Sequence, residues 1–342
     1  MKGGMYLPNK LYDKIKHFFK ENWSFFLFLI FFGVVFNIRL PYYIKAPGGL
    51  ANVSERLTIE GASKSEGSYN LAFVSEMDAT IPSLLIAYFH PDWDIVKKEE
   101  IVLKNETEKE STIRSHLLLE EANQNAIWYA YQKAGKEVSF TNAEIFVTYI
   151  AKEAETTLKV GDKILEINGE EIKDKNSLYT LISTKKVDDV LFFKVLRDEK
   201  EVNATATLIE VEGIPKIGMM ITEKKDLNAT PSFSFHFSLN ESGSSGGLMM
   251  TLAIYDALMD EDFTKGRTIV GTGTIDEEGI VGSIAGVRYK LIGAVEKGAD
   301  IFFVPAGENY EEAIMVQKEK GYTIEIVPVS TFDDALDYLI NH

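Results

Sequence analysis

The sequence predicts a multidomain protein of mixed α/β and α+β class, with an N-terminal transmembrane helix ahead of its folded regions. An uncharged apolar segment at residues 22–38 indicates that helix. Short strands joined by tight turns are typical of residues 124–212, and strands alternate with helices over residues 213–342. A chain of 342 residues is long enough for these regions to be separate domains with filled cores.

Composition and missing motifs exclude several classes of function. The formal net charge is −16, and because phosphate binding needs a basic surface we expect no nucleic-acid partner. The chain has no cysteine, which rules out disulfides and a cysteine nucleophile. It also has no H-E-x-x-H pair and no G-x-x-x-x-G-K-[ST] loop, and residues 271–276 lack the third glycine of a dinucleotide loop. We therefore expect no metal and no cofactor, ATP included.

The apolar segment at residues 22–38 is just long enough to cross a bilayer, which needs roughly 17–25 residues. A cleaved signal peptide would need a small-residue cleavage site, but the segment continues into RLPYYIK at residues 39–45. A buried core helix is the other alternative, and Trp23, Tyr42 and Tyr43 at its two ends fit an interfacial aromatic belt better. The lysines ahead of the segment place the N-terminus in the cytoplasm and the remainder outside the cell; they are Lys10, Lys14, Lys16 and Lys20.

Residues 41–123 form a small mixed α/β region between the anchor and the next domain. Alternating apolar residues indicate its strands, and longer apolar repeats that end at polar residues or a glycine indicate its helices. His116 lies on the second helix and is expected to be structural. The expected elements are strands at residues 56–61 and 68–76 and helices at residues 80–90 and 108–135.

Residues 158–172 read LKVGDKILEINGEEI and contain a strand, a turn and a second strand. Asn168-Gly169 is the strongest short signal for a tight hairpin turn. With the helix expected at residues 176–183, this pattern resembles the PDZ family, over residues 124–212. The resemblance implies capture of a peptide end by strand addition. The carboxylate-binding loop of that family is not clear in the stretch before Glu144, and a module that only packs on its neighbours is the alternative.

Residues 213–342 alternate between strands and helices, and a serine-rich stretch lies among them. SLNESGSSGGLMM at residues 238–250 follows a strand and precedes a helix. A helix N-terminus favours developing negative charge, so the stretch can form an oxyanion hole, whereas ordinary helix capping is the alternative. The expected strands are residues 233–239, 266–275, 300–307 and 323–329, and the expected helices are residues 246–260, 283–299, 309–321 and 331–340.

Residues 271–309 resemble the proteolytic domain of Lon-type peptidases nearly end to end. That family carries a serine in a G-P-S-A-G turn that opens a helix, and a lysine on a later helix that follows an I-G-G turn. Residues 243–247 correspond to the serine turn and residues 284–290 to the lysine segment. The resemblance therefore places the nucleophile at Ser245, the base at Lys290 and the family's threonine near the lysine at Thr272.

The serine turn departs from that pattern in ways that keep the turn feasible. Ser244 replaces proline and Gly246 replaces alanine, so small residues remain, with Gly243 and Gly246 supporting the turn. Ser242 stands where the family usually has an acidic residue. Ala285 replaces the first glycine of the I-G-G turn. These differences bear on the fine geometry and leave both dyad members present.

A Ser–Lys dyad needs no histidine, but its lysine must be neutral to accept the serine proton. The reference pKa of lysine is about 10.4, and burial among apolar residues lowers it. Leu291 and Ile292 beside Lys290 are the expected apolar surroundings. Lys290 would then take the proton from Ser245 and later donate it to the leaving amine, while Thr272 holds the amine in position.

The order of segments resembles the membrane-anchored PDZ–Lon-type serine peptidases of Gram-positive bacteria, a family that includes a pheromone-processing member. The resemblance implies an ATP-independent serine endopeptidase that cleaves secreted peptides, such as a pheromone, or surface proteins outside the cytoplasm, and it allows a homo-oligomer. The alternative is a membrane-tethered PDZ scaffold with an inactive Lon-like domain. The expected boundaries are residues 1–21 for the cytoplasmic N-terminus, 22–40 for the anchor, 41–123 for the mixed region, 124–212 for the PDZ domain and 213–342 for the proteolytic domain.

Overall fold

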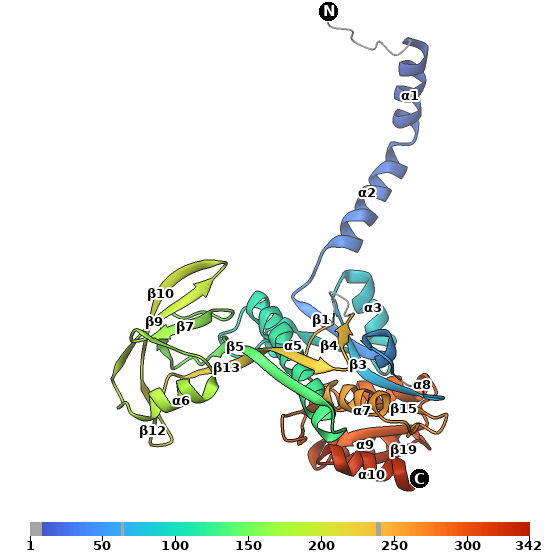
Figure 1. The fold of residues 1–342 in the computed structure, drawn as a ribbon. Helices are drawn as coiled ribbons and strands as arrows, with labels where there is room; N and C mark the ends of the chain where they lie inside the picture. The colour runs from blue at the N-terminus through green and yellow to red at the C-terminus, as the bar shows by residue number, and fades with distance from the viewer. Residues whose placement is uncertain (1–8, 63–64, 237–240) are drawn as a thin grey trace, which may run out of the picture. The chain divides into compact units, whose positions relative to one another are not determined.

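The computed structural model describes residues 9–62, 65–236 and 241–342 (Figure 1). The chain divides into two compact units. The N-terminal unit holds the residues up to 46 together with residues 76–98. The main unit holds residues 47–75 and 99–342. Strands β1 (Tyr42–Asn52) and β3 (Ser68–Asp78) each contribute residues to both units.

The N-terminal unit begins with two helices, α1 (Asn9–Glu21) and α2 (Trp23–Asn37), which meet at a bend of 67°. Within the described residues, neither helix alone has the length and hydropathy of a membrane span, but the bent pair together does. No side chain of α2 is buried in the protein. The remaining elements of this unit are α3 (Ile81–Phe89) and β4 (Asp94–Lys97), which pairs antiparallel with the first residues of β1. The last residue of the unit, Lys98, is the first residue of α4 (Lys98–Ile101).

A parallel sheet forms the centre of the main unit. Its strand order is β19 (Glu325–Val329), β18 (Ile301–Pro305), β15 (Thr268–Gly271) and β3, with β1 next to β3. Each neighbouring pair from β19 to β3 is parallel. All five residues of β18 are buried, as expected for a continuous apolar run in a parallel sheet that is covered on both faces.

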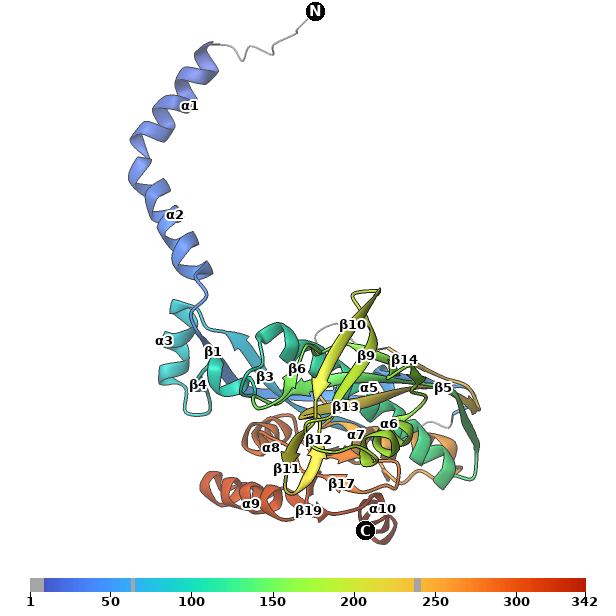
Figure 2. The ribbon, with the colours of Figure 1, turned by 90° about the vertical axis from the view of Figure 1, so that its left-hand side faces the viewer.

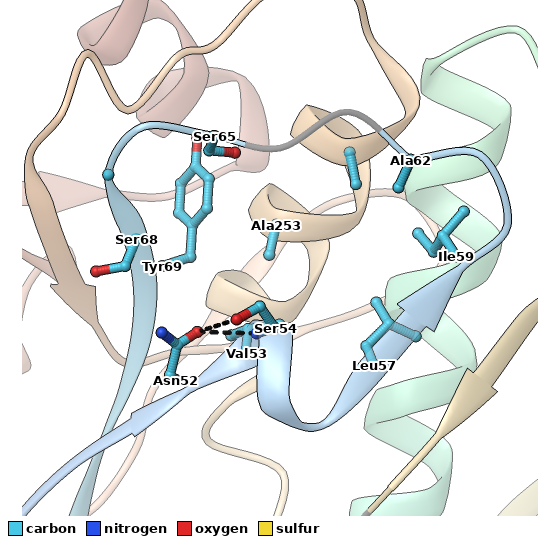
Figure 3. Close-up of a pocket in the computed structure, with 12 residues that line it drawn as sticks. Asn52, Val53, Ser54, Leu57, Ile59, Ala62, Ser65, Ser68, Tyr69 and Ala253 are labelled. Carbon is cyan, nitrogen blue, oxygen red and sulfur yellow. Dashed lines mark hydrogen bonds between the residues drawn. The ribbon is translucent and has the colours of Figure 1, made fainter.

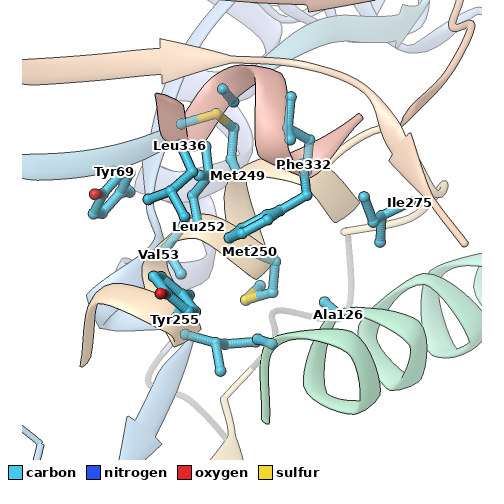
Figure 4. Packing of buried hydrophobic residues seen from close by; sticks show 14 of the residues in the cluster. Val53, Tyr69, Ala126, Met249, Met250, Leu252, Tyr255, Ile275, Phe332 and Leu336 are labelled. Carbon is cyan, nitrogen blue, oxygen red and sulfur yellow. The ribbon is translucent and has the colours of Figure 1, made fainter. Parts of the chain in front are cut away.

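Helix α7 (Gly247–Leu258) is the most deeply buried helix of the main unit. Apolar residues occur all round it, and ten of its residues are buried, which is typical of a core helix. Figure 4 shows Met249, Met250 and Leu252 packed among Phe332 of α10 (Phe332–Asn341) and Ala126 of α5 (Glu108–Lys133). Helices α8 (Val287–Glu296) and α9 (Glu308–Lys320) pack on each other and on β18.

A second sheet of the main unit carries the strand–turn–strand motif of residues 158–172. Its expected hairpin turn is confirmed, because Asn168 and Gly169 both have positive φ and join two antiparallel strands. Helix α6 (Lys175–Ser183) follows, in agreement with the sequence. The strand order is β13 (Met219–Thr230), β5 (Glu137–Ile150), β7 (Lys163–Ile167), β9 (Val190–Arg197), β10 (Lys200–Thr207) and β6 (Glu155–Thr156), with β8 (Glu170–Glu171) on β7 and the hairpin β11 (Ile209–Val211)–β12 (Ile214–Lys216) beyond it.

The structure joins segments that the sequence assigned to different regions. Residues 68–71 of β3 pair with β15, and β2 (Leu57–Ile59) pairs with β14 (Phe233–Phe235), so much of the mixed region belongs to the main unit. The expected boundary between residues 123 and 124 falls inside α5, whose buried Ala126 and Ile127 pack in the core with α7. Of the strand expected at residues 233–239, the structure forms β14, and residues 237–239 lie outside the described residues. The short elements left are η1 (Val53–Glu55), β16 (Thr274–Ile275) and β17 (Val281–Gly282).

Candidate active site and peptide groove

Ser245 lies in the turn that opens the buried helix α7. Gly243 enters this turn with a φ of 86°, a conformation that favours glycine, and its N–H donates to the Ser115 carbonyl at 2.9 Å. Gly246 is the last residue before the helix, and its missing Cβ leaves room for Leu71, whose methyl carbon lies 3.1 Å from the position a Cβ would take. The turn therefore holds Ser245, half-buried, at the positive end of the helix dipole.

Ser245 opens onto a pocket of about 330 Å³. Arg56 and Glu241 form part of its wall and are joined by two hydrogen bonds of 2.9 Å from the guanidinium to the carboxylate. This pair joins Glu241, two residues before the serine turn, to Arg56, which directly precedes β2 and is 185 residues away in the sequence. The pair was not predicted from the sequence, because the Lon-type pattern usually has its acidic residue at position 242, and Glu241 lies one residue earlier.

Lys290 lies on α8 with only 4% of its surface exposed. Its Nζ donates a hydrogen bond of 3.0 Å to the Thr272 hydroxyl. Burial lowers the pKa of Lys290 to about 8, against the weaker opposing effect of Glu312, which raises it. The neighbours Leu291 and Ile292 are fully buried, in line with the apolar surroundings expected from the sequence.

Thr272 connects the lysine to the serine turn. It is fully buried at the end of β15, and its hydroxyl donates to the Ser245 carbonyl oxygen at 3.1 Å. The N–H of Gly273 donates to the same carbonyl at 2.8 Å. Among the described residues, no hydrogen bond joins the Ser245 hydroxyl to the Lys290 ammonium. Thr272 thus links Lys290 to the backbone of Ser245. In enzymes without substrate, catalytic hydrogen bonds are often long and shorten only when the substrate binds, so a missing Ser245–Lys290 hydrogen bond does not exclude the pair.

A second cavity, of about 300 Å³, is also lined by residues of α7, and Figure 3 shows Ala253 of that helix among them with Asn52 and Tyr69. The buried Asp256 of the same helix accepts hydrogen bonds from the Tyr69 hydroxyl at 3.1 Å and the Phe263 N–H at 2.9 Å. Burial raises the pKa of Asp256. No lysine or histidine is among the described residues that line this cavity, so it offers no base for a serine nucleophile.

The second sheet contains a groove of about 880 Å³ between α6 and the edge strand β13. An edge strand presents unpaired N–H and C=O groups that can bind an added strand. Gly218 stands just before β13 with a φ of 77°, and a Cβ there would lie 2.9 Å from the Ala154 side chain. In the sequence, this groove is marked by Gly218 inside the apolar run at residues 217–221. The resemblance to the PDZ family places the carboxylate-binding loop in the stretch before Glu144 instead. The groove side of α6 is formed by Leu178, Tyr179, Ile182 and Ser183.

Two family models match the chain. The PDZ domain model matches residues 129–208, and the model of the Lon protease C-terminal proteolytic domain matches residues 229–342. The chain combines a PDZ domain with a Lon-type proteolytic domain. The second match covers Ser245, Thr272 and Lys290, and the first covers α6 and most of the second sheet.

Curated proteins that the chain is similar to include Lon proteases. The chain is 28% identical over 190 residues to the Lon protease of Campylobacter jejuni, which covers 53% of this chain and 22% of that protein. It is 25% identical over 149 residues to the archaeal Lon protease of Halobacterium salinarum, which covers 41% of this chain and 20% of that protein. The chain thus spans about a fifth of the length of these relatives. These similarities support a peptidase.

Among solved structures, the PDZ domain of an SdrC-like protein from Listeria innocua is 28% identical to the matched part of the chain. The match covers 23% of this chain and 92% of that domain, with a TM-score of 0.22. Within the residues that the structure describes, no group of three or more histidine, aspartate or glutamate side chains is arranged to hold a metal ion.

Proposed function

We propose that this protein is an ATP-independent serine endopeptidase that is anchored in the membrane and acts outside the cytoplasm. The observation that carries the proposal is the buried Lys290, whose pKa is lowered to about 8 and whose ammonium reaches the Ser245 carbonyl through Thr272. A lysine of this kind is partly neutral at physiological pH, as a general base must be. The similarity to Lon proteases supports the same chemistry.

Ser245 is the proposed nucleophile. Neutral Lys290 takes the proton of the Ser245 hydroxyl as its oxygen attacks the substrate carbonyl. The N-terminus of α7 stabilises the oxyanion of the tetrahedral intermediate, and the protonated Lys290 then donates its proton to the leaving amine. Water attacks the acyl-enzyme in a second cycle with the same proton transfers. Thr272 holds the Lys290 amine in position in both half-reactions. Its hydroxyl accepts a hydrogen bond from the amine and is itself fixed, because it donates to the Ser245 carbonyl.

Anchoring rests on the apolar helix α2 and on the lysines that precede it. Phe25, Phe28 and Phe31 of α2 are each more than half exposed, which is costly in water and favourable in lipid. By the positive-inside rule the lysine-rich N-terminus lies in the cytoplasm, so the proteolytic domain lies outside. Substrates are then secreted peptides or flexible segments of surface proteins near the membrane.

Cleavage of an unfolded polypeptide by the purified full chain tests the proposed activity. We expect turnover without ATP and the same turnover in EDTA, because Ser245 and Lys290 need neither a nucleotide nor a metal. A folded, disulfide-closed form of the same polypeptide is the matched control and should resist cleavage. Loss of turnover in the chelator would contradict the proposal and indicate a metal-dependent reaction.

The pH dependence of kcat/KM follows from the lowered pKa of Lys290. Below that pKa the lysine is protonated and cannot act as a base, so kcat/KM should rise about tenfold per pH unit and level off above pH about 8. Glu312→Gln removes the charge that raises the pKa of Lys290, so the profile should shift to lower pH. A value of kcat/KM that does not change between about pH 6 and about pH 9 would exclude Lys290 as the base.

The groove between α6 and β13 is the proposed site where an extended substrate segment binds. Ile182→Glu places a charge in its apolar wall and should raise KM for a long polypeptide by at least about tenfold, the cost of losing a central contact. Cleavage of a short peptide that reaches only the Ser245 pocket should not change. Thr180→Glu, on an exposed position of the same helix outside the groove, is the control. Equal KM values for Ile182→Glu and wild type would exclude the groove.

A further inference from the structure

Helix α3 of the N-terminal unit presents apolar side chains to solvent. Residues 79–89 carry no charge, and Leu85 and Ile86 are 61% and 57% exposed. Tyr88 and Phe89 are 77% and 80% exposed, and their rings form an edge-to-face pair. Scattered apolar residues are normal on a protein surface, but a run of large ones on one uncharged helix marks an interaction site.

The start of α3 is held at the place where the chain leaves the apolar helix α2. The Leu40 N–H donates to the Ala79 carbonyl at 2.8 Å, and the Ala79 N–H donates to the Tyr42 carbonyl at 3.0 Å. Arg39, two residues after α2, forms an ion pair of 3.0 Å with Asp78. Figures 1 and 2 both show α3 beside the C-terminal end of α2. The exposed side chains of α3 therefore lie at the level where the anchor ends.

The opposite face of α3 is fixed to the rest of its unit. Ala87 is buried and packs in a small cluster with Ile44 and Ala79. Thr80 and Ser83 form a capping box that fixes the first turn of the helix. With one face bound in this way, the exposed face keeps a constant direction relative to the end of α2.

We propose that α3 lies in the headgroup region of the bilayer as a second membrane contact of the N-terminal unit. The proposal rests on the membrane anchoring proposed above. Lipid is the occupant because the exposed face continues from the uncharged α2 at the same level, and because tyrosine at the rim of an apolar patch favours the membrane interface. Two contacts, α2 and α3, prevent the unit from rotating freely about the anchor.

Site-directed spin labelling of the full chain tests this proposal, and the natural absence of cysteine makes single-cysteine variants clean. Phe28→Cys reports on α2, and Tyr88→Cys with Leu85→Cys reports on α3. Asp94→Cys is the control, because Asp94 is exposed and pairs with Lys45 of β1, which is farther from the anchor along the chain than Leu40. The variants are reconstituted in vesicles of phosphatidylcholine and phosphatidylglycerol, and collisions with oxygen and with a water-soluble nickel chelate are measured.

We expect the labels at residues 28, 85 and 88 to collide with oxygen and to be shielded from nickel, with those on α3 roughly 5–10 Å deep. The label at residue 94 should show the reverse. A shielded label at residue 28 with nickel-accessible labels at 85 and 88 would overturn the proposal and leave the anchor standing. Nickel access at all positions would overturn the anchor and the proposal together. Labels at 85 and 88 shielded from both reagents would show that protein, such as a second copy, covers α3, and would also overturn it.

Discussion

Ser245→Ala is expected to lower kcat/KM for peptide cleavage by at least about 10⁴-fold, because removing a nucleophile leaves only the residual catalysis of the binding site. The fold should not change, since the hydrogen bonds that join Ser245 to Thr272 and Gly273 are accepted by its backbone carbonyl, which alanine keeps. Circular dichroism and thermal unfolding check the fold, and initial rates on an unfolded polypeptide measure the loss.

Ser242→Ala and Ser244→Ala are the matched controls for that experiment. Both serines lie in the same stretch, and neither is placed at the nucleophile position by the resemblance to Lon-type peptidases. A serine-directed covalent probe should label wild type and both controls and should not label Ser245→Ala. Absence of labelling in wild type would favour a tethered PDZ scaffold with an inactive proteolytic domain, and equal labelling of Ser245→Ala would move the nucleophile elsewhere.

Lys290→Met is expected to abolish turnover and to make the protein more stable. Methionine fills the apolar site without a charge, so the nucleophile loses its base while the core keeps its volume. Burial lowers the lysine pKa from 10.5 to about 8, which corresponds to roughly 3 kcal/mol of destabilisation at neutral pH. The free energy of unfolding should therefore rise by up to that amount, as urea unfolding at pH 7 would measure.

The gain in stability has a definite pH dependence. Below about pH 8 Lys290 is charged in both the folded and the unfolded state, and the cost of burying its charge is fully present. As the pH rises from about 8 to 10.5, the folded state loses the proton first, and the stability of wild type rises toward that of the variant. Lys290→Met should thus differ most from wild type at neutral pH. A variant that is less stable than wild type at pH 7 would indicate a structural lysine.

Several elements could be predicted from the sequence because their signals are local. A helix was predicted at residues 246–260, and α7 spans Gly247–Leu258. The glycine that follows Asn168 indicates a tight turn, and both residues have the positive φ that such a turn needs. Helix α3 was predicted at residues 80–90, and it spans Ile81–Phe89.

The candidate site was predicted in part. The resemblance to Lon-type peptidases singled out Ser245, Lys290 and Thr272, and the structure places the Lys290 ammonium on the Thr272 hydroxyl and that hydroxyl on the Ser245 backbone. The Arg56–Glu241 pair was not predicted, because its members are 185 residues apart and Glu241 lies one residue before the position where the Lon-type pattern usually has an acidic residue. The position of the groove between α6 and β13 was not predicted either, since the two elements meet only once the strands of the second sheet have paired.

The sequence by itself determined many of the helices and strands, the order of the two matched domains and the identity of the residues proposed for the dyad, because periodicity, turn residues and motifs are written along the chain. Only the tertiary structure decided that residues 68–71 join the sheet of the proteolytic domain and that α5 crosses the expected boundary. It alone also showed that Lys290 is buried deeply enough for its pKa to fall to about 8. Burial and strand pairing depend on contacts between residues far apart in the chain, and a local pattern carries no information about which distant segment supplies them.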